Sequence, residues 1–271
     1  MSTNSEHTLK IRNRRYRRLS SAEKQEIREL IRKGFSLENI ALKLNLRKST
    51  VYYHARTYCK KQTKLNMNAL SAKEQGYILG MFVGDGNVIM KTSKGQYGLK
   101  FTLDNKRDQK IAHFLRILFK KAGKKTETRT EARSLYIRIF SKKLTGFISN
   151  LVSTTKRPDS QRNIKSLVNY ENWSSDFKIG FVSGLLDSDG YVHYGKKGKH
   201  YGAVIKTNNP SLAKQIQGIF SDLKVMAEIR AHEFQGTYPT DNLCYDIYIP
   251  SKEMWKFCHT LLSIKHSEHH Q

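Results

Sequence analysis

Hydrophobic and polar residues alternate along several short segments of the chain, and this alternation predicts β-strands. In the segment 97–103 every second residue from position 99 is apolar, while Lys100 and Thr102 between them are polar. Successive side chains of a strand point to opposite faces, so such a segment has one buried and one exposed face. Apolar residues three or four positions apart predict amphipathic helices between the strands, as around Ile111 and Leu115.

The order of expected elements occurs twice along the chain. Residues 76–88 read GYILGMFVGDGNV and residues 180–192 read GFVSGLLDSDGYV, with five identities at a constant offset of 104. After each copy the pattern predicts two strands, a helix, two further strands and a closing helix. Each repeat is therefore expected to be an αββαββα unit, because self-similarity at a fixed offset indicates a repeated structural unit.

Small residues within the repeated segment indicate that its two helices pack closely. Gly80 and Gly84 lie four positions apart in the first copy, as do Gly184 and Ser188 in the second. Residues four apart lie on one face of a helix, so this face lacks bulky side chains and two backbones can approach each other there.

One acid ends each of these helices: Asp85 in the first copy and Asp189 in the second. If the helices are neighbours, both carboxylates lie at the negative ends of two helix dipoles, which is unfavourable unless cations neutralise them. We therefore expect the pair to bind a divalent metal, Mg²⁺ or Mn²⁺, through carboxylate oxygens. Another acid of the second copy, Asp187, aligns with Val83 and is expected to be structural.

The N-terminal part of the chain has a different pattern, in which three short amphipathic segments predict three helices. Ser20 can form a capping box with the glutamate three residues later, and Ser36 can cap the second helix. Ser49 is expected to cap the third helix, which is expected to run to about Lys60. Asn45, between the second and third helices, tolerates the left-handed conformation of a tight turn.

The spacing of these three segments resembles the helix-turn-helix of bacterial and phage regulators and recombinases. Ala41 is small where two helices would cross, Asn45 turns the chain four residues later, and Val51 packs back six residues after that. By this resemblance the third helix enters the major groove of DNA, with an ordinary three-helix bundle as the alternative. The residues then expected to face DNA are Arg47, Lys48, Ser49, Thr50, Tyr52, Tyr53, His54 and Arg56.

The charge of the chain favours a polyanionic partner. Lysine and arginine number 49 against 23 acidic residues, a formal net charge of +26, and residues 1–66 alone carry 17 basic and 5 acidic residues. Nucleic acid is the first candidate for such a partner. Within residues 1–18, an arginine cluster that includes Arg14 and Arg15 indicates an arm that lies in a minor groove, with a solvated basic tail as the alternative.

The composition disfavours several other classes of protein. No apolar run approaches the roughly 20 residues that span a bilayer, and the N-terminal sequence lacks the apolar core of a secretory signal. The three cysteines, Cys59, Cys244 and Cys258, are isolated, so they indicate neither a paired zinc motif nor a disulfide framework. We therefore expect no membrane partner and an intracellular, unsecreted protein, whose compartment the sequence leaves open.

The two repeated segments resemble the paired motifs of LAGLIDADG homing endonucleases that carry both motifs on one chain. The resemblance covers residues 70–265 and implies an α+β fold: two pseudo-twofold αββαββα units with DNA-binding antiparallel sheets, preceded by the small all-α helix-turn-helix domain. The expected segments are a basic arm, the helix-turn-helix domain, the first unit, a connector and the second unit, at residues 1–18, 19–66, 67–152, 153–175 and 176–271.

The resemblance also implies a site-specific double-strand DNA endonuclease that hydrolyses phosphodiester bonds at a long asymmetric target. Asp85 and Asp189 would then be catalytic metal ligands. Basic side chains near each acid would steady the transition state, and the candidates are Lys156 and Lys265, just beyond the two closing helices. The outward polar residues of the sheets that are expected to contact DNA are Lys100, Arg138 and Lys206.

Both motifs stand on one chain, so we expect a monomer bound to double-stranded DNA. Two alternatives stay open: a non-cleaving DNA-binding regulator on the same scaffold, and a maturase that acts on intron RNA. The presence of both acids favours cleavage over the first alternative. The helix-turn-helix favours duplex DNA over the second.

Overall fold

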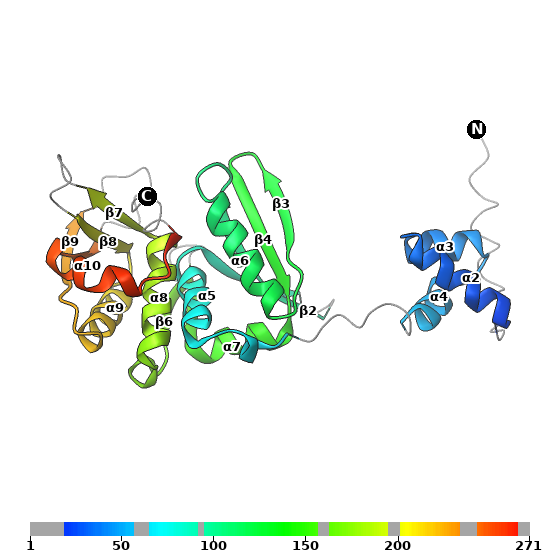
Figure 1. Cartoon of the computed structure of the whole chain (residues 1–271), viewed down its shortest axis with the longest axis horizontal. Helices are drawn as coiled ribbons and strands as arrows, with labels where there is room; N and C mark the ends of the chain where they lie inside the picture. Colours follow the sequence, from blue (N-terminus) through cyan, green and yellow to red (C-terminus); the bar gives the residue numbers. More distant parts are fainter. Residues whose placement is uncertain are drawn as a thin grey trace. The chain divides into compact units, whose positions relative to one another are not determined.

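The chain forms two compact units in the computed structural model, Met1–Lys64 and Leu65–Gln271 (Figure 1). Among the described residues, no helix is both long and apolar enough to cross a membrane. Five residues named above lie outside the described residues: Arg14, Arg15, Cys59, Lys60 and Lys265. The structure describes residues 19–56, 65–91, 95–156, 163–194, 201–233 and 243–264.

Three helices form the described part of the N-terminal unit: α2 (Ser21–Arg32), α3 (Leu37–Lys43) and α4 (Lys48–Ala55). They enclose a small hydrophobic core in which Ile27 of α2 and Val51 of α4 are fully buried. The inward position of Val51 is the one that the helix-turn-helix spacing predicts.

The start of the first two helices and the turn after the second confirm the predictions. The hydroxyl of Ser20 accepts from the backbone N–H of Glu23, whose carboxylate in turn accepts from the N–H of Ser20, so a capping box is present. Ser36 caps α3 through its hydroxyl. Asn45 has a φ of 51°, the left-handed conformation expected of the turn.

The prediction for the third helix is wrong at both ends. Its N-cap is Arg47, which makes no side-chain capping bond, and the helix ends at Ala55 rather than near Lys60. The carbonyl of Arg47 already accepts from the N–H of Val51, so helical hydrogen bonding begins before Ser49. Ser49 is therefore the second residue of α4 and lies inside it.

The second unit contains one order of elements twice, αββαββα, as predicted. The first repeat consists of α5 (Ala72–Asp85), β1 (Gly86–Lys91), β2 (Gln96–Asp104), α6 (Gln109–Lys121), β3 (Glu127–Glu131), β4 (Ser134–Phe140) and α7 (Lys142–Leu151). The second consists of α8 (Ser175–Ser188), β7 (Gly190–Tyr194), β8 (Tyr201–Thr207), α9 (Pro210–Asp222), β9 (Glu228–Glu233), β10 (Leu243–Ile249) and α10 (Ser251–Phe257).

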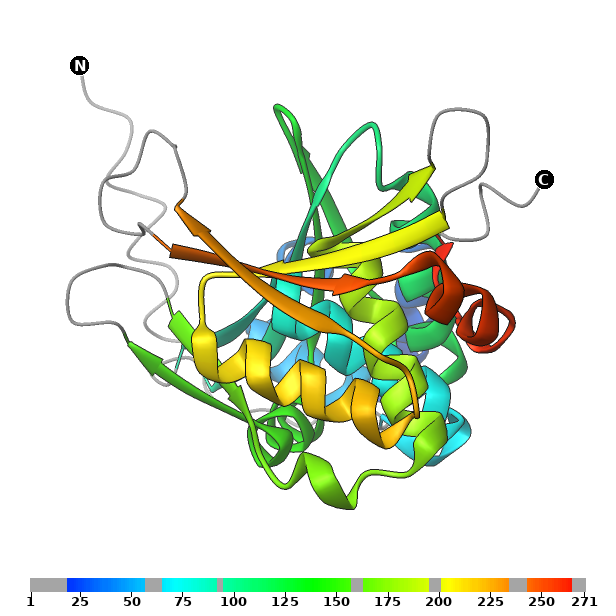
Figure 2. The same cartoon turned by 90° about the vertical axis from the view of Figure 1, so that its left-hand side faces the viewer.

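Each repeat forms its own four-stranded antiparallel sheet, in the order β1-β2-β4-β3 and β7-β8-β10-β9. The alternation of β2 is confirmed, because Leu99, Phe101 and Leu103 are buried while Lys100 and Thr102 are partly exposed. Figure 2 shows α9 lying along one side of β8, β10 and β9. The sheets therefore have helices on one face and polar side chains on the other.

The connector between the repeats contains elements that the sequence pattern did not predict. The strands β5 (Val152–Lys156) and β6 (Asn163–Leu167) pair as an antiparallel hairpin. Among the described residues of the second unit, three segments are 3₁₀ helices: η1 (Met67–Ala69), η3 (Tyr170–Asn172) and η4 (Cys258–Thr260). The hairpin is attached to the second repeat: Asn209 donates to the carbonyl of Lys165, and Gln215 exchanges two hydrogen bonds with the backbone of Leu167.

The helices α5 and α8 pack side by side at the centre of the second unit (Figure 1). A Cβ atom at Gly80 would overlap the carbonyl oxygen of Phe181, and one at Gly184 would overlap that of Tyr77. The two backbones therefore touch without intervening side chains, as the small residues predict.

Candidate active site and nucleic-acid interface

The parallel packing of α5 and α8 brings their C-terminal ends together. Asp85 is the last residue of α5, and Asp189 is the C-cap of α8. A Cβ atom at Gly84 would lie 2.9 Å from Oδ2 of Asp189, so the second acid lies against the end of the first helix. Asp85 is partly exposed and Asp189 is exposed. This edge of the unit therefore presents two carboxylates to solvent at the negative ends of two helix dipoles.

A lysine that the sequence analysis did not single out lies at the same place. The ammonium of Lys165, on β6, donates to the carbonyls of Phe82, Val83 and Gly86 over 2.7, 2.8 and 2.7 Å. It lies 3.4 Å from the carbonyl oxygen of Gly84 and 4.9 Å from the ring centroid of Phe82. These carbonyls form the C-terminal end of α5, which a cation stabilises.

The charge of Lys165 is coupled to both acids. Burial lowers the pKa of Lys165 to about 8, while the negative charges of Asp189 and Asp85 act in the opposite direction. The ammonium therefore offsets part of the negative charge of two carboxylates that lie at adjacent helix ends.

Sequence reasoning missed Lys165 because the residue lies outside both repeats. It stands in the connector, about 80 positions after the carbonyls that it binds, and no motif marks it. Its segment, NIKSL, alternates polar and apolar residues irregularly, so no local signal in the sequence distinguishes Lys165 from a solvent-exposed lysine.

The described residues do not test the two lysines predicted near the acids, Lys156 and Lys265. Lys156 is the last residue of β5 and pairs with Asn163 in the hairpin, but its side chain is outside the described part of the structure. The position of Lys265 is outside it altogether. The role of both lysines stays a prediction.

Asp187 lies close to the acid pair in sequence but is buried, with 1% of its surface exposed. Its carboxylate accepts from the hydroxyl of Tyr77 (2.8 Å), the hydroxyl of Ser263 (2.7 Å) and the N–H of Ile264 (2.8 Å). Burial and this neighbouring carboxylate raise the pKa of Tyr77 well above its ordinary value. Asp187 therefore joins α5, α8 and the C-terminal segment, as expected of a structural acid.

The outward face of the first sheet carries two of the basic residues predicted to contact DNA. Lys100 and Arg138 are directly opposite each other on β2 and β4. Their charged groups lie 5.1 and 5.9 Å from the ring centroid of Tyr136. On the second sheet, Lys206 lies 5.5 Å from the ring of Tyr191. Each sheet therefore offers cations held beside aromatic rings on its polar face.

The third helix of the N-terminal unit exposes most of the residues predicted to face DNA. Tyr52 and Tyr53 are 60% and 54% exposed, and the guanidinium of Arg56 lies 4.4 Å from the ring of Tyr53. Arg47 and Lys48 are also exposed, and Lys48 forms an ion pair with Glu38 of α3 at 3.0 Å; Thr50 is partly exposed. The placement suits a recognition helix, although Ser49 does not act as its cap.

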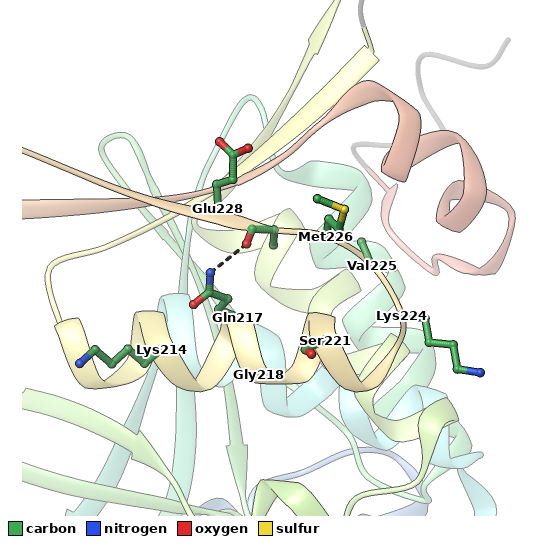
Figure 3. A pocket seen from close by; sticks show the side chains of 9 residues that line it. Lys214, Gln217, Gly218, Ser221, Lys224, Val225, Met226 and Glu228 are labelled. Atoms are coloured by element: carbon green, nitrogen blue, oxygen red, sulfur yellow. Dashed lines mark hydrogen bonds between the residues drawn. The ribbon is translucent and has the colours of Figure 1, made fainter.

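A pocket of about 570 Å³ lies elsewhere, between α9 and the start of β9 (Figure 3). Gln217 donates to the carbonyl of Ala227 within it at 2.9 Å. Its lining residues are Lys214, Gln217, Gly218, Ser221, Lys224, Val225, Met226, Ala227 and Glu228. None of the acids, lysines or arginines predicted at the site lines this pocket, so it is separate from the acid pair.

Two parts of the chain match the models of known protein families. Residues 176–261 match the LAGLIDADG-like domain, and residues 15–56 match a helix-turn-helix domain. No curated protein sequence matches the chain significantly.

Among solved structures, the second unit is similar to the homing endonuclease I-DmoI. A glycine-to-serine variant of I-DmoI with its target DNA and magnesium has a TM-score of 0.51 and 21% identity, covering 73% of this chain and 99% of that chain. I-DmoI with DNA and calcium has a TM-score of 0.52 and 20% identity, covering 74% and 98%. The protein thus carries a LAGLIDADG-like domain in its second repeat, the LAGLIDADG fold over both repeats, and a helix-turn-helix domain near its N-terminus.

Proposed function

We propose that this protein is a metal-dependent, site-specific endonuclease that cuts both strands of duplex DNA. The observation that carries this proposal is the pair Asp85 and Asp189 at the ends of two parallel, touching helices. Two carboxylates in such a position oppose both helix dipoles, so the helix ends by themselves do not favour an acid at either place. A role in holding cations for phosphodiester hydrolysis explains their placement.

The donor set suits a hard divalent cation. Asp85 and Asp189 supply carboxylate oxygens. Among the described residues, no histidine nitrogen or cysteine sulfur lies close enough to them to form a group of three ligands. Oxygen donors are what Mg²⁺ and Mn²⁺ prefer. When bound, such an ion would supply positive charge against the charge that develops on the phosphate during hydrolysis.

We assign the remaining work to the residues of the chain. Asp85 and Asp189 bind the metal and so fix where the phosphodiester reacts, at the edge of the unit where both sheets meet the central helices. Lys100, Arg138 and Lys206 bind the DNA backbone or base edges on the polar faces of the sheets. Lys165 fixes the C-terminal turn of α5 and so positions Asp85, because it holds the carbonyls on both sides of that residue.

The similar structures support the proposal at the level of fold. I-DmoI has been crystallised with its target DNA and with magnesium or calcium. Both repeats lie in one compact unit, so a single chain contains both acids. We infer that a monomer acts on an asymmetric site, and sedimentation of the DNA complex would reveal one chain per duplex.

The test is cleavage of a plasmid library that carries candidate target sites, with and without Mg²⁺. We expect wild-type protein to linearise a subset of plasmids only with the metal, and the double variant Asp85→Asn/Asp189→Asn to bind the same DNA without cutting it. Asp176→Asn is the matched control, because Asp176 is an exposed acid at the opposite end of α8. Binding without cleavage by the wild type would favour a regulator, and selective binding of structured intron RNA would favour a maturase.

The helix-turn-helix domain is proposed to extend the DNA contact. Removal of residues 1–64 leaves the second unit complete, because Leu65 is the first residue buried in its core. We expect a shorter protected footprint and a weaker salt dependence, with about 0.9 lost from the slope of log K against log salt per phosphate contact. An unchanged footprint and slope would show that this domain serves another partner.

A further inference from the structure

The outward face of the second sheet carries three metal-binding side chains that belong to neither repeated motif. They are His232 on β9 and Cys244 and Asp246 on β10. One ligand atom of each lies within 4.8 Å of those of the other two. In the part of the chain that the structure describes, this is the one group of three histidine, cysteine or acidic side chains that lie so close together.

The strand register explains why the three residues meet. His232 lies directly opposite Cys244 in the β9–β10 ladder, and Asp246 follows Cys244 by two positions on the same strand. Residues two apart on a strand share a face, and directly opposed residues have adjacent Cβ atoms. The three side chains are therefore held by hydrogen-bonded backbone rather than by a loop.

The carboxylate of Asp246 divides its two oxygens between different neighbours. Oδ2 lies 3.9 Å from Nδ1 of His232. Oδ1 lies 3.8 Å from Nζ of Lys206, is buried and has no hydrogen-bond partner in the structure. A buried carboxylate oxygen without a hydrogen bond is costly, so this acid is poorly satisfied by its protein neighbours alone.

We propose that His232, Cys244 and Asp246 bind one zinc-class transition-metal ion through nitrogen, sulfur and carboxylate oxygen. Three protein ligands of these types fit a tetrahedral ion that keeps one open position. Bonds of about 2.0–2.1 Å from such an ion set nitrogen and oxygen ligands about 3.4 Å apart. The observed 3.9 Å between Nδ1 and Oδ2 is therefore closed by a small side-chain rotation.

The charges of the group support a divalent ion. Metal binding replaces the thiol proton, and the thiolate and the carboxylate then neutralise the two positive charges of the ion. Lys206 lies at ion-pair distance, 3.8 Å, from the other carboxylate oxygen and acts as an outer contact of the site.

The location of the metal site indicates a role in DNA binding. It lies on the sheet face that also presents Lys206 and Arg230, where we expect DNA. Without metal, Asp246 places a negative charge on this face; with metal, the ion, the thiolate and the carboxylate together are neutral. A water molecule, or an oxygen or nitrogen atom of the DNA, can occupy the open ligand position of the ion. The proposal does not depend on cleavage, because neither Asp85 nor Asp189 takes part.

The test is Co²⁺ titration of the metal-free full-length protein in a Cys59→Ser background. We expect a thiolate-to-cobalt charge-transfer band and tetrahedral visible bands that saturate at one ion per chain and disappear when Zn²⁺ is added. Cys244→Ser should abolish the charge-transfer band. His232→Ala and Asp246→Asn should weaken the affinity at least tenfold, the lower bound for loss of a supporting partner.

Two controls separate this site from other metal binding. Cys258→Ser removes a buried cysteine of the second unit that is not part of the group, and it should leave the band unchanged. The double variant Asp85→Asn/Asp189→Asn should also leave it unchanged, even if cleavage is lost. Absence of the band in the parent protein, or its survival in Cys244→Ser with a native circular dichroism spectrum, would overturn the proposal.

Discussion

The two repeats share their order of elements and a helix-terminal acid, yet opposite charges support the two helix ends. At the end of α5, the ammonium of Lys165 holds main-chain carbonyls on both sides of Asp85. Near the end of α8, the buried carboxylate of Asp187 accepts hydrogen bonds from Tyr77 and from the C-terminal segment. The end of α5 thus has a partly buried cation beside it, whereas the last turn of α8 carries a buried carboxylate.

The backbone therefore preserves the pseudo-twofold symmetry, while the side chains that support the two helix ends do not. Lys165 comes from the connector and reaches the first repeat, although its hairpin is attached to Asn209 and Gln215 of the second. The acids Asp85 and Asp189 therefore stand in unequal surroundings. We expect them to contribute unequally to the cleavage of the two DNA strands.

The largest expected effect is on cleavage by the single variants Asp85→Asn and Asp189→Asn. Each should reduce double-strand cutting by at least about 100-fold, because one oxygen ligand set is lost and roughly 2.7 kcal/mol of barrier lowering corresponds to that factor. Time courses on supercoiled plasmid would resolve nicked from linear product. Nicking that differs between the two variants would support unequal sites, and full-rate cutting by either would contradict the two-carboxylate mechanism.

The next effect is on stability, through Asp187→Asn. The amide would turn N–H donors towards partners that themselves donate, so we expect a loss of about 3 kcal/mol of unfolding free energy in urea. Ser263→Ala is the milder comparison, since it removes one hydrogen bond and should cost about 1 kcal/mol. A loss below 1 kcal/mol for Asp187→Asn would show that this carboxylate does not join the helices to the C-terminal segment.

Lys165→Met tests the other side of the comparison. The variant leaves the α5 carbonyls without their cation and the acid pair without its neutralising charge, so we expect about 2 kcal/mol lower stability in the absence of metal. Adding Mg²⁺ should raise the melting temperature of the variant more than that of the wild type. Lys165→Arg keeps the charge and should behave as an intermediate. Equal responses to Mg²⁺ would mean that Lys165 does not offset the charge of the acids.

The smallest expected effect concerns the start of the two central helices. At the start of α5, Ser71 and Glu74 form a capping box, and Lys121 pairs with Glu74 at 2.7 Å. At the start of α8, Ser174 caps the helix without a capping box, because the third residue is Phe177 and has no carboxylate. Burial would raise the pKa of Glu74, but the hydrogen bonds from Lys121 and Ser71 outweigh it, so its pKa lies below the ordinary value.

A lowered carboxyl pKa stabilises the fold above the unfolded-state value and loses this contribution as the pH falls through the folded-state value. Glu74→Gln should therefore cost about 0.5 kcal/mol at pH 7, a small amount because solvent screens the pair. The difference from wild type should shrink as the pH falls below the ordinary carboxyl range and vanish once Glu74 is protonated in both states. A difference that is independent of pH would assign the effect to the cap geometry rather than to the charge.

The order of elements, the buried faces of the strands and the position of the two acids at helix ends were all predictable from the sequence. Each of these depends on local rules: period-two alternation in β2, small residues four apart in α5 and α8, and an acid followed by glycine at each helix end. The capping residues Ser20 and Ser36 were predictable for the same reason. Ser49 was not, because the tight turn after Asn45 lets helical hydrogen bonding start at Arg47.

Which distant side chains meet the helix ends and the sheet faces could be learned only from the folded chain. Lys165 binds carbonyls about 80 positions earlier, Asp187 binds a tyrosine more than a hundred positions earlier, and Cys244 meets His232 through strand register. Such contacts leave no periodic trace in the sequence, since a single polar residue in a connector or strand has the same local pattern whether its partner is water or a buried charge. Long-range backbone packing sets that partner, and only the folded chain specifies it.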